Sequence, residues 1–156
     1  GIGAIQHDLI KAGALNGTSI EASSAYIDVA KEETSQNVLA ERVNFKHGDF
    51  TTTASDVDSA DIVTLDKVIC CYDDMSELVR LSSKLARKIY AVIYPRDVWW
   101  TKLALPMMNF YPRLKGSSFR VFIHPTKKVE KIIFGNGLKR NYYATTLFWQ
   151  VAIFTR

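Results

Sequence analysis

The chain has 156 residues, of which 47% are hydrophobic and 23% are charged, and its formal net charge is +4 at pH 7. These values are typical of one globular domain that is long enough to bury a core. The small positive excess is scattered, so it does not predict a nucleic-acid partner. No apolar run reaches the length of a transmembrane helix. The two cysteines, Cys70 and Cys71, are adjacent and lack the spacing of a zinc site, so we expect reduced thiols, no bound metal and a cytoplasmic location.

The chain opens on Gly1-Ile2-Gly3, directly before a helical pattern over residues 4–13. Glycines let a backbone pass close to a ligand, because they lack Cβ and accept positive φ. A short strand predicted over residues 16–20 then delivers Glu21. A glycine turn, a helix, a strand and an acid about 20 residues on is the layout of a nucleotide-ribose site in a doubly wound α/β domain. Taken alone, the glycine pair also fits an ordinary tight turn.

Helices and strands are expected to alternate over the next part of the chain. A second helix begins at Ser23 or Ser24, with an apolar stripe made of Tyr26, Ile27, Ala30, Val38 and Leu39. A strand over residues 42–47 leads into Gly48-Asp49-Phe50, and residues 51–59 are expected to form a loop or one short helix.

The alternation continues with a buried strand over residues 61–66 that ends on Asp66. Asp73 or Asp74 begins a helix, and a strand over residues 88–94 follows it. Strands and helices in this order predict a parallel sheet with helices on both faces.

The order changes after this strand, where residues 98–115 are rich in aromatic residues and methionine and two prolines, Pro106 and Pro112, interrupt the segment. A short extended piece follows, and Thr126 is expected to cap the next helix. Two closing strands, over residues 138–144 and 147–155, have a connection so short that they must be antiparallel. We expect a single domain over residues 1–156, with an inserted lid or substrate segment over residues 97–125.

With these motifs, the whole chain resembles a class I S-adenosylmethionine-dependent methyltransferase. The resemblance is carried by Glu21 after the second strand, Gly48-Asp49-Phe50 after the third, Asp66 after the fourth, and the closing antiparallel hairpin. Gly1-Ile2-Gly3 matches the second half of the family's glycine-rich motif, an acid followed by Gly-x-Gly-x-Gly. The segments 66–73 and 94–100 are similar to a small-molecule branch that includes magnesium-protoporphyrin O-methyltransferases. The resemblance implies a Rossmann-like, doubly wound and mostly parallel sheet.

The family's first strand and the acid that leads its glycine motif are missing before Gly1. We therefore expect this sequence to be N-terminally truncated. We also expect residues 1–156 to fold poorly alone, because the missing strand would lie at the centre of the sheet.

The resemblance implies that S-adenosyl-L-methionine is the cofactor. Glu21, with Ala22 beside it, would accept hydrogen bonds from both ribose hydroxyls, since one carboxylate can take two donors. The alternative for Glu21 is a solvated acid after a strand. Asp49 would accept from the adenine amino group and Phe50 would cover a face of the ring, whereas the alternative for Asp49 is an ordinary Gly-Asp turn.

Three further residues complete the implied cofactor site. Gly1 and Gly3 would let the backbone pass under the amino-acid portion of the cofactor. Asp66 would lie beside the methionine moiety, which agrees with the rule that open α/β sheets bind ligands at the carboxyl ends of their strands.

Methyl transfer asks mainly for in-line positioning of the acceptor, and it needs a base only if the acceptor must lose a proton. His124 is the candidate catalytic base, and its alternative is a histidine before Pro125 that only packs or caps. Among the candidate substrate-binding residues at the end of the 88–94 strand, Tyr94 is polar, and Arg96 could clamp a carboxylate or pair with Asp97. His7 and His47 are expected at the surface.

The aromatic segment contributes Trp99 and Trp100 as candidate substrate-binding residues, and it admits three interpretations. It could line an apolar substrate pocket, or form a lid helix packed on the core. It could also be an amphipathic helix that faces a membrane, since Lys102, Arg113 and Lys115 are nearby.

The resulting hypothesis is an enzyme that transfers a methyl group from S-adenosylmethionine to a small, apolar acceptor. Two alternatives remain open at this point. One is an NAD-type oxidoreductase, because a glycine turn and an acid after the second strand serve both classes. The other is a methyltransferase-like domain that binds partners without catalysis.

Overall fold

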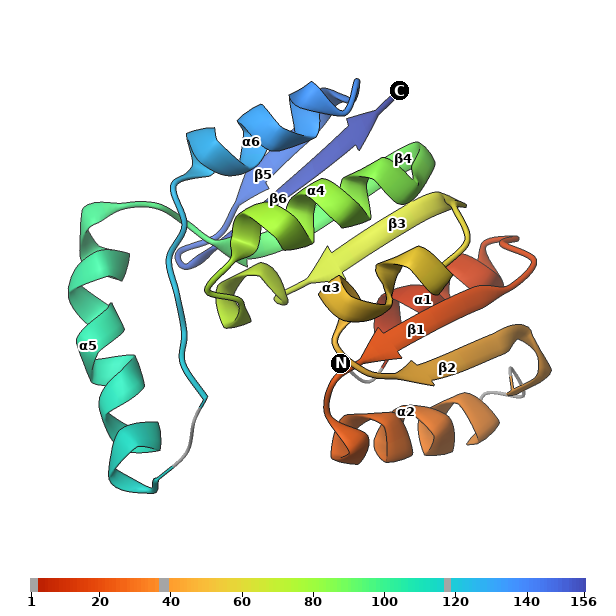
Figure 1. The fold of residues 1–156 in the computed structure, drawn as a ribbon, viewed down its shortest axis with the longest axis horizontal. Coiled ribbons are helices and arrows are strands. Elements are labelled where there is room, and N and C mark those ends of the chain that lie inside the picture. Colours follow the sequence, from red (N-terminus) through yellow and green to blue (C-terminus); the bar gives the residue numbers. More distant parts are fainter. Residues whose placement is uncertain (1–2, 37–39, 117–118) are drawn as a thin grey trace. The chain divides into compact units, whose positions relative to one another are not determined.

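The computed structural model describes residues 3–36, 40–116 and 119–156. The chain divides into two compact units, Gly1–Asp56 and Val57–Arg156. Each unit contains its own sheet, with strand order β1-β2 in the first and β3-β4-β6-β5 in the second (Figure 1). The single-domain boundary and the inserted segment over residues 97–125 stay predictions.

The first unit is built around a parallel pair of strands. Gly17 of β1 lies opposite Val43 of β2, and the pairing continues to Glu21 opposite His47. In chain order the elements are α1 Ala4–Lys11, β1 Gly17–Glu21, α2 Ser24–Gln36, the 3₁₀ helix η1 Ala40–Arg42, β2 Val43–His47, α3 Phe50–Thr53 and η2 Ala54–Asp56. The predicted helix, strand, helix and strand are all present, and the strands agree with the predicted ranges to within one residue.

The turn between α1 and β1 follows from Gly13, whose φ of +113° favours glycine. Its N–H donates to Ile10 O at 3.1 Å and the N–H of Ala14 donates to Leu9 O at 2.9 Å, which closes the helix end. Ile10 and Val43 are then buried together, with Ala14 and Phe45 packed against them.

The buried side of α2 differs from the prediction. Ile27 and Ala30 are buried as expected, but Tyr26 is 54% exposed, while Val38 and Leu39 lie outside the described residues. Thr34 completes the buried side instead, because its hydroxyl donates to Ala30 O at 2.6 Å and needs no water.

The predicted surface position of His7 is wrong, because this side chain is only 6% exposed. His7 Nε2 lies 2.8 Å from Thr34 Oγ1, and the single hydroxyl proton of Thr34 goes to Ala30 O. His7 therefore donates to Thr34, which ties α1 to α2 through two buried polar groups. His47 is exposed, as predicted, and its Nε2 lies 3.1 Å from Ala22 O.

The second unit contains a mixed four-stranded sheet. β3 and β4 pair in parallel, and the β4–β6 and β6–β5 pairs are antiparallel. The elements are β3 Ala60–Asp66, η3 Ile69–Cys71, α4 Met75–Leu85, β4 Ala86–Pro95, α5 Trp99–Leu114, α6 Thr126–Gly135, β5 Lys139–Thr145 and β6 Trp149–Thr155. This sheet confirms the predicted α/β fold class, with parallel strands and a C-terminal antiparallel hairpin.

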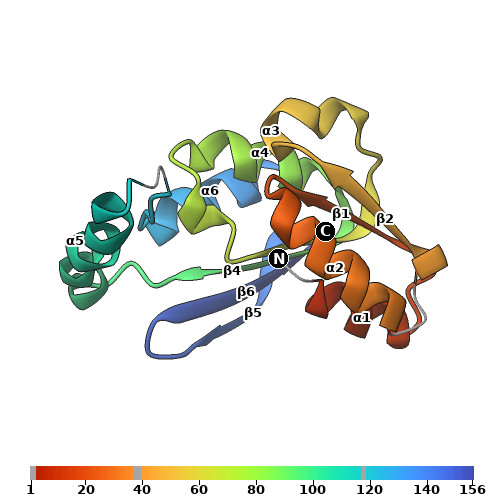
Figure 2. The same ribbon diagram turned by 90° about the horizontal axis from the view of Figure 1, so that it is seen from below.

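Two helices, α4 and α6, lie together on one side of this sheet (Figures 1 and 2). Tyr90, Val92 and Tyr94 of β4 are almost fully buried, and so are Ala152 and Phe154 of β6. The rings of Phe154 and Phe134 of α6 are 6.0 Å apart between centroids. This alternation of buried residues along the strands forms the core of the second unit.

The helix α4 begins as the sequence predicts. Asp74 is its N-cap, and Asp74 Oδ1 accepts a hydrogen bond from the N–H of Glu77 at 3.2 Å. Its buried side includes Ser82 and Ser83, whose hydroxyls donate to Leu78 O and Val79 O. These back-bonds let polar side chains take core positions.

Two expectations for the following segment are wrong. Pro106 and Pro112 do not interrupt the helix: α5 runs through both, although each proline removes a backbone hydrogen bond and crowds the preceding turn. Thr126 is not a cap, since Pro125 occupies the cap position and the Thr126 hydroxyl bonds Gln150. Residues 119–125 are extended without forming a strand, and the N–H of Phe122 donates to Cys70 O at 2.7 Å.

Candidate cofactor and substrate sites

In the first unit, the carboxyl ends of β1 and β2 bring most of the predicted cofactor residues to one edge. Glu21 and His47 are paired at the ends of these strands. The N–H of Gly48 donates to Glu21 O at 3.1 Å, so the turn that carries Asp49 begins beside Glu21 and Ala22. The parallel pairing makes these positions neighbours, although more than twenty residues separate them in sequence.

Glu21 is partly buried, and its carboxylate is oriented by the backbone that follows it. Glu21 Oε1 accepts a hydrogen bond from the N–H of Ser23 at 3.0 Å. A carboxylate accepts hydrogen bonds through two oxygen atoms, which is the chemistry that the two hydroxyl groups of a ribose require.

Asp49 has a structural task as the N-cap of α3. Asp49 Oδ1 accepts from the N–H of Thr51 at 2.8 Å and from the Thr51 hydroxyl at 2.7 Å. Phe50 follows it and is half-buried. The cap fixes Asp49 at the strand edge, so the turn and the adenine role are compatible.

Gly3 adopts a φ of +85° at the start of α1, in the left-handed region that favours glycine. A Cβ at this position would lie 3.5 Å from Nε2 of the buried His7. The backbone conformation predicted for the glycine turn is therefore present at Gly3. Gly1 lies outside the described residues.

In the second unit, Asp66 ends β3 with an exposed side chain. The next residue, Lys67, has a φ of +57°, and its N–H donates to Ile93 O at 2.8 Å. Lys67 Nζ lies 5.3 Å from the centroid of the Trp149 ring. Sequence reasoning missed Lys67, because lysine carries no signal for a left-handed conformation.

His124 is half-buried, and Nε2 lies 2.8 Å from the carbonyl oxygen of Tyr72. A carbonyl only accepts, so Nε2 carries the proton, and the neutral ring keeps its lone pair on Nδ1. The imidazole ring stacks on the ring of Phe122, with the two ring centroids 6.0 Å apart. The predicted base is thus oriented by a backbone group, and Nδ1 is the nitrogen that could accept a proton.

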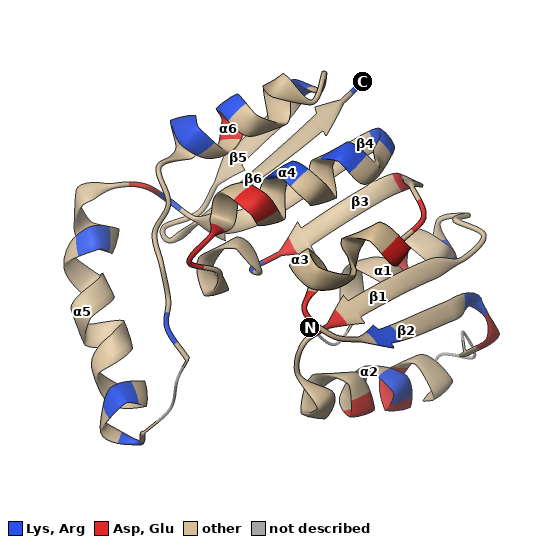
Figure 3. Cartoon of the chain, viewed as in Figure 1, with Lys and Arg blue, Asp and Glu red and all other residues tan. Residues whose placement is uncertain are grey.

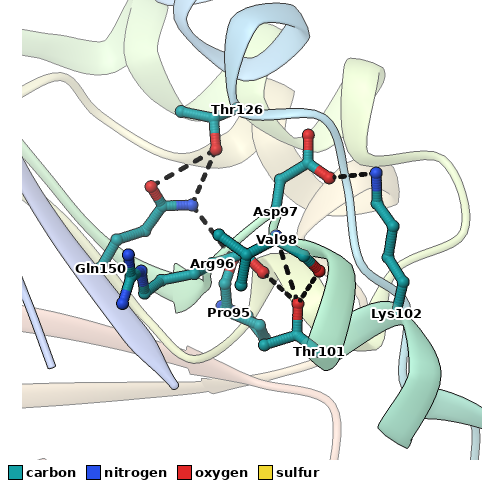
Figure 4. A network of polar contacts seen from close by, with 8 residues as sticks. All are labelled: Pro95, Arg96, Asp97, Val98, Thr101, Lys102, Thr126 and Gln150. Atoms are coloured by element: carbon teal, nitrogen blue, oxygen red, sulfur yellow. Dashed lines mark hydrogen bonds and ion pairs between the residues drawn. The ribbon is translucent and has the colours of Figure 1, made fainter. Parts of the chain in front are cut away.

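A polar network joins the end of β4 to α5, α6 and β6 (Figure 4). Gln150 is 1% exposed, and its Nε2 donates to Pro95 O at 3.0 Å and to Thr126 Oγ1 at 2.9 Å. The Tyr143 hydroxyl donates to Gln150 Oε1 at 3.0 Å. One buried amide therefore fixes three elements, and no sequence pattern singled it out.

Arg96 does not pair with Asp97, so this alternative is wrong. The two side chains extend in different directions (Figure 4), and Asp97 Oδ1 lies 2.7 Å from Lys102 Nζ. The Arg96 guanidinium lies 5.3 Å from the Trp100 ring centroid and donates to Thr146 O at 3.1 Å. Arg96 is thereby held at the end of β4.

A hollow of about 370 Å³ lies at this end of the second unit, lined by Arg96, Asp97, Val98, Pro125, Thr126, Lys127, Tyr143 and Gln150. Another hollow, beside Leu138 and Lys139, lies at the opposite ends of the strands, away from the predicted site. The mixed polar and apolar lining of the first hollow suits a small molecule.

The remaining predicted substrate residues differ in exposure. Trp99 is 73% exposed and its ring contacts that of Trp100 edge to face, with centroids 5.9 Å apart. Tyr94, in contrast, is 1% exposed, and burial raises the pKa of its hydroxyl above the ordinary value. Tyr94 therefore belongs to the packed interior, and we do not include it in the proposed substrate site.

Within the described residues, no group of three or more His, Cys, Asp or Glu side chains is arranged to hold a metal ion. Across the same ranges, no helix has the length and apolar character needed to cross a bilayer.

A family model described as a methyltransferase domain matches residues 1–88. The chain belongs to this family. Methyltransferases of this class use S-adenosylmethionine, so the predicted family, enzyme class and cofactor are confirmed, and the NAD-type alternative is set aside. No curated protein matches the chain.

Solved methyltransferase structures share the fold. Magnesium protoporphyrin IX methyltransferase from Synechocystis PCC 6803 with bound SAH gives a TM-score of 0.78 at 19% identity, covering 100% of this chain and 70% of that one. An O-methyltransferase family protein from Burkholderia thailandensis gives 0.79 at 16% identity, covering 100% of this chain and 48% of that one. An O-methyltransferase family 2 protein from Planctomyces limnophilus in complex with apigenin gives 0.72 at 15% identity, again with 100% and 48% coverage.

The chain thus spans about half the length of each of these two O-methyltransferases. At these identities the likeness concerns the fold. The activity and substrates of the whole protein are accordingly matters of proposal.

Proposed function

We propose that the protein transfers a methyl group from S-adenosylmethionine to a small, apolar acceptor. The observation that carries this proposal is the hollow at the end of β4, which is lined by Arg96, and the Arg96 guanidinium lies 5.3 Å from the centroid of the half-buried Trp100 ring. Flat aromatic side chains beside a few fixed polar groups suit an apolar molecule with one polar end. The magnesium protoporphyrin IX and apigenin-bound relatives support an aromatic acceptor of this kind.

We propose that Gly1, Gly3, Glu21, Ala22, Asp49, Phe50 and Asp66 bind the cofactor. When bound, S-adenosylmethionine supplies a methyl group that its sulfonium already activates. Glu21 and Asp49 would fix the nucleoside by hydrogen bonds, and the positive φ of Gly3 supports close passage of the backbone. The chain's own contribution is therefore chiefly orientation.

We propose that the segment over residues 97–125 is the acceptor side of the enzyme. Arg96 would contact a polar end of the acceptor, and Trp99 and Trp100 would contact its apolar part. For an acceptor that must lose a proton, His124 Nδ1 would take it, because Nε2–H is held by Tyr72 O. A screen of acceptors with the His124→Asn variant tests this role, which predicts loss of transfer only to acceptors with an ionisable proton.

The proposed partners are small molecules, without a nucleic acid. We propose the cytoplasm as the working location, because two adjacent cysteines without the spacing of a disulfide framework are typical of a reducing compartment.

The first test is calorimetric titration of S-adenosylhomocysteine into the intact protein, with NAD as the comparison ligand. We expect binding of S-adenosylhomocysteine alone, and Glu21→Ala should weaken it about 10- to 100-fold, since charge-assisted hydrogen bonds are lost. The matched control is Glu32→Ala, an exposed acid on α2 of the same unit, which should bind normally. Equal affinity in Glu21→Ala and Glu32→Ala would contradict the proposed ribose role.

A further inference from the structure

The helix α5 carries six large apolar side chains that are exposed to between 61% and 80% of their surface: Trp99, Leu103, Met107, Phe110, Tyr111 and Leu114. Their spacing of three and four residues places them on one face of the helix. We call this set the α5 stripe. An exposed apolar stripe of this size indicates an interaction surface.

The opposite side of α5 is tied to its own unit, so the orientation of the stripe is fixed. Thr101 is 3% exposed, and its hydroxyl lies 2.7 Å from the carbonyl oxygens of both Arg96 and Val98. The side chain of Asn109 bonds the backbone of Val121 twice, with Nδ2 donating to the carbonyl at 2.9 Å and Oδ1 accepting from the N–H at 2.8 Å. Two views show α5 standing apart from the sheet of its unit (Figures 1 and 2). The stripe therefore faces outward.

The charged side chains along α5 are all basic, and Lys102 among them is paired with Asp97, which precedes the helix. At 100° per residue, Lys102 and Arg113 lie along one border of the stripe and Lys115 lies along the other. No acidic residue occurs in the sequence between Asp97 and Glu130. Figure 3 shows basic and no acidic positions along α5.

We propose that the α5 stripe docks the enzyme onto an anionic lipid surface, with the helix lying in the plane of the interface. Apolar side chains would enter the boundary of the acyl chains, and Arg113 and Lys115 would contact the headgroups. Trp99 and Tyr111 suit this depth, because each has an apolar ring and a polar atom.

A bilayer fits this surface better than a second copy of the chain does. Two α5 stripes packed together would bring their bordering cations close to one another, and like charges oppose such an interface. A surface of negative headgroups instead complements Arg113 and Lys115, which border the stripe on its two sides. This inference goes beyond the proposed methyl transfer and does not depend on it.

The test is flotation of the intact protein with vesicles of phosphatidylcholine, alone or mixed with phosphatidylglycerol. We expect binding to the mixed vesicles, a blue shift of tryptophan emission as Trp99 leaves water, and weaker binding as salt screens the charges. Leu103→Glu should weaken binding at least about tenfold, because it removes apolar burial and adds a repelled charge. Leu15→Glu is the matched control, since Leu15 is 83% exposed in the first unit, and it should bind as the unaltered protein does.

A double variant tests the contribution of the basic side chains. Arg113→Gln combined with Lys115→Gln should remove most of the preference for phosphatidylglycerol while retaining the emission maximum of the unbound protein. Affinity for S-adenosylhomocysteine, measured in the same preparations, should be unchanged in every variant and so shows that folding is intact.

Several outcomes would overturn the proposal. Absence of binding to both kinds of vesicle would do so, as would equal binding to neutral and anionic vesicles. A dimer in sedimentation that becomes a monomer in Leu103→Glu, without vesicle binding by either, would assign the stripe to self-association instead.

Discussion

The turn after β3 places two thiols in different surroundings. Lys67 adopts a left-handed conformation, and its carbonyl oxygen lies 3.3 Å from Cys70 Sγ and 3.6 Å from Cys71 Sγ. Cys70 is buried, and Cys71 is exposed, although their sulfur atoms are only 4.0 Å apart. The hydrogen bond with Cys71 and burial together raise the pKa of the Cys70 thiol well above its ordinary value. Because the thiolate is the reactive form, adjacent cysteines should differ in reactivity.

We predict that brief treatment with iodoacetamide at neutral pH modifies Cys71 at least about ten times faster than Cys70. Peptide mass spectrometry of the alkylated protein measures the two rates. The Cys70→Ser variant should keep the fast reaction and Cys71→Ser should lose it. Similar rates at both positions in the folded protein would show that Cys70 is not protected.

At the residue scale, sequence reasoning succeeds where the signal is local. The positive φ of Gly3 and the position of Glu21 at a strand end were both predicted, because glycine and strand patterns report on their own neighbourhood. The buried pair of His7 and Thr34 was not predicted, since these residues are 27 positions apart. A polar contact between distant elements leaves no periodic pattern.

At the scale of elements, the C-terminal hairpin is joined to the rest of its unit by Gln150. The side chain is buried and bonds Pro95, Thr126 and Tyr143, so it connects β6 to the end of β4, the start of α6 and β5. A buried amide of this kind is costly to remove, because several hydrogen bonds between elements are lost together.

We predict that Gln150→Leu lowers the free energy of unfolding by about 1–3 kcal/mol, since it removes the hydrogen bonds to Pro95 O, Thr126 Oγ1 and the Tyr143 hydroxyl. Urea unfolding followed by circular dichroism measures the change. Gln36→Leu, at the exposed end of α2, is the control and should change stability little. A loss of less than about 1 kcal/mol in Gln150→Leu would mean that the network is not a structural connection.

The start of α4 was predicted from Asp74, because a capping side chain acts on its own helix. The course of α5 through Pro106 and Pro112 was not, because a proline penalty can be outweighed by contacts elsewhere. For α5 those contacts are Thr101 and Asn109, which bond backbone atoms outside the helix.

At the scale of the whole molecule, the order of helices and strands was predicted well in each unit. The alternation up to β4 and the short connection between β5 and β6 determine which pairs are parallel and which are antiparallel. Burial at the end of β4 was not predicted, because Tyr94 inside the strand and Arg96 just after it differ in exposure. The direction of a side chain at the end of a strand depends on how α6 packs against it. The sequence of the strand alone carries no information about that packing.

The core also determines how the stability of the molecule depends on alkaline pH. Tyr90 is fully buried, its hydroxyl lies 2.7 Å from Ser82 Oγ, and burial raises the pKa of Tyr90 above its ordinary value. In the unfolded chain the same hydroxyl ionises near pH 10. Above that pH the unfolded state loses a proton that the folded state keeps, so stability falls as the pH rises.

We predict that Tyr90→Phe flattens this alkaline loss by about 1.4 kcal/mol per pH unit above pH 10, the contribution of one tyrosine. Urea unfolding at several pH values between neutral and strongly alkaline measures the slope for both proteins. The exposed Tyr142 provides the control, because Tyr142→Phe should leave the slope unchanged. Identical slopes in Tyr90→Phe and the unaltered protein would show that Tyr90 ionises without unfolding.

The strand order of the second unit places β5 at one edge of the sheet, where its backbone could recruit a strand from another molecule. The strand begins with Lys139 and Arg140, and its register with β6 shifts between Arg140 and Tyr142. Two cations and an irregular register make this edge a poor template for a further strand. The hairpin that completes the fold thus also disfavours the growth of fibrils by addition of strands at this edge.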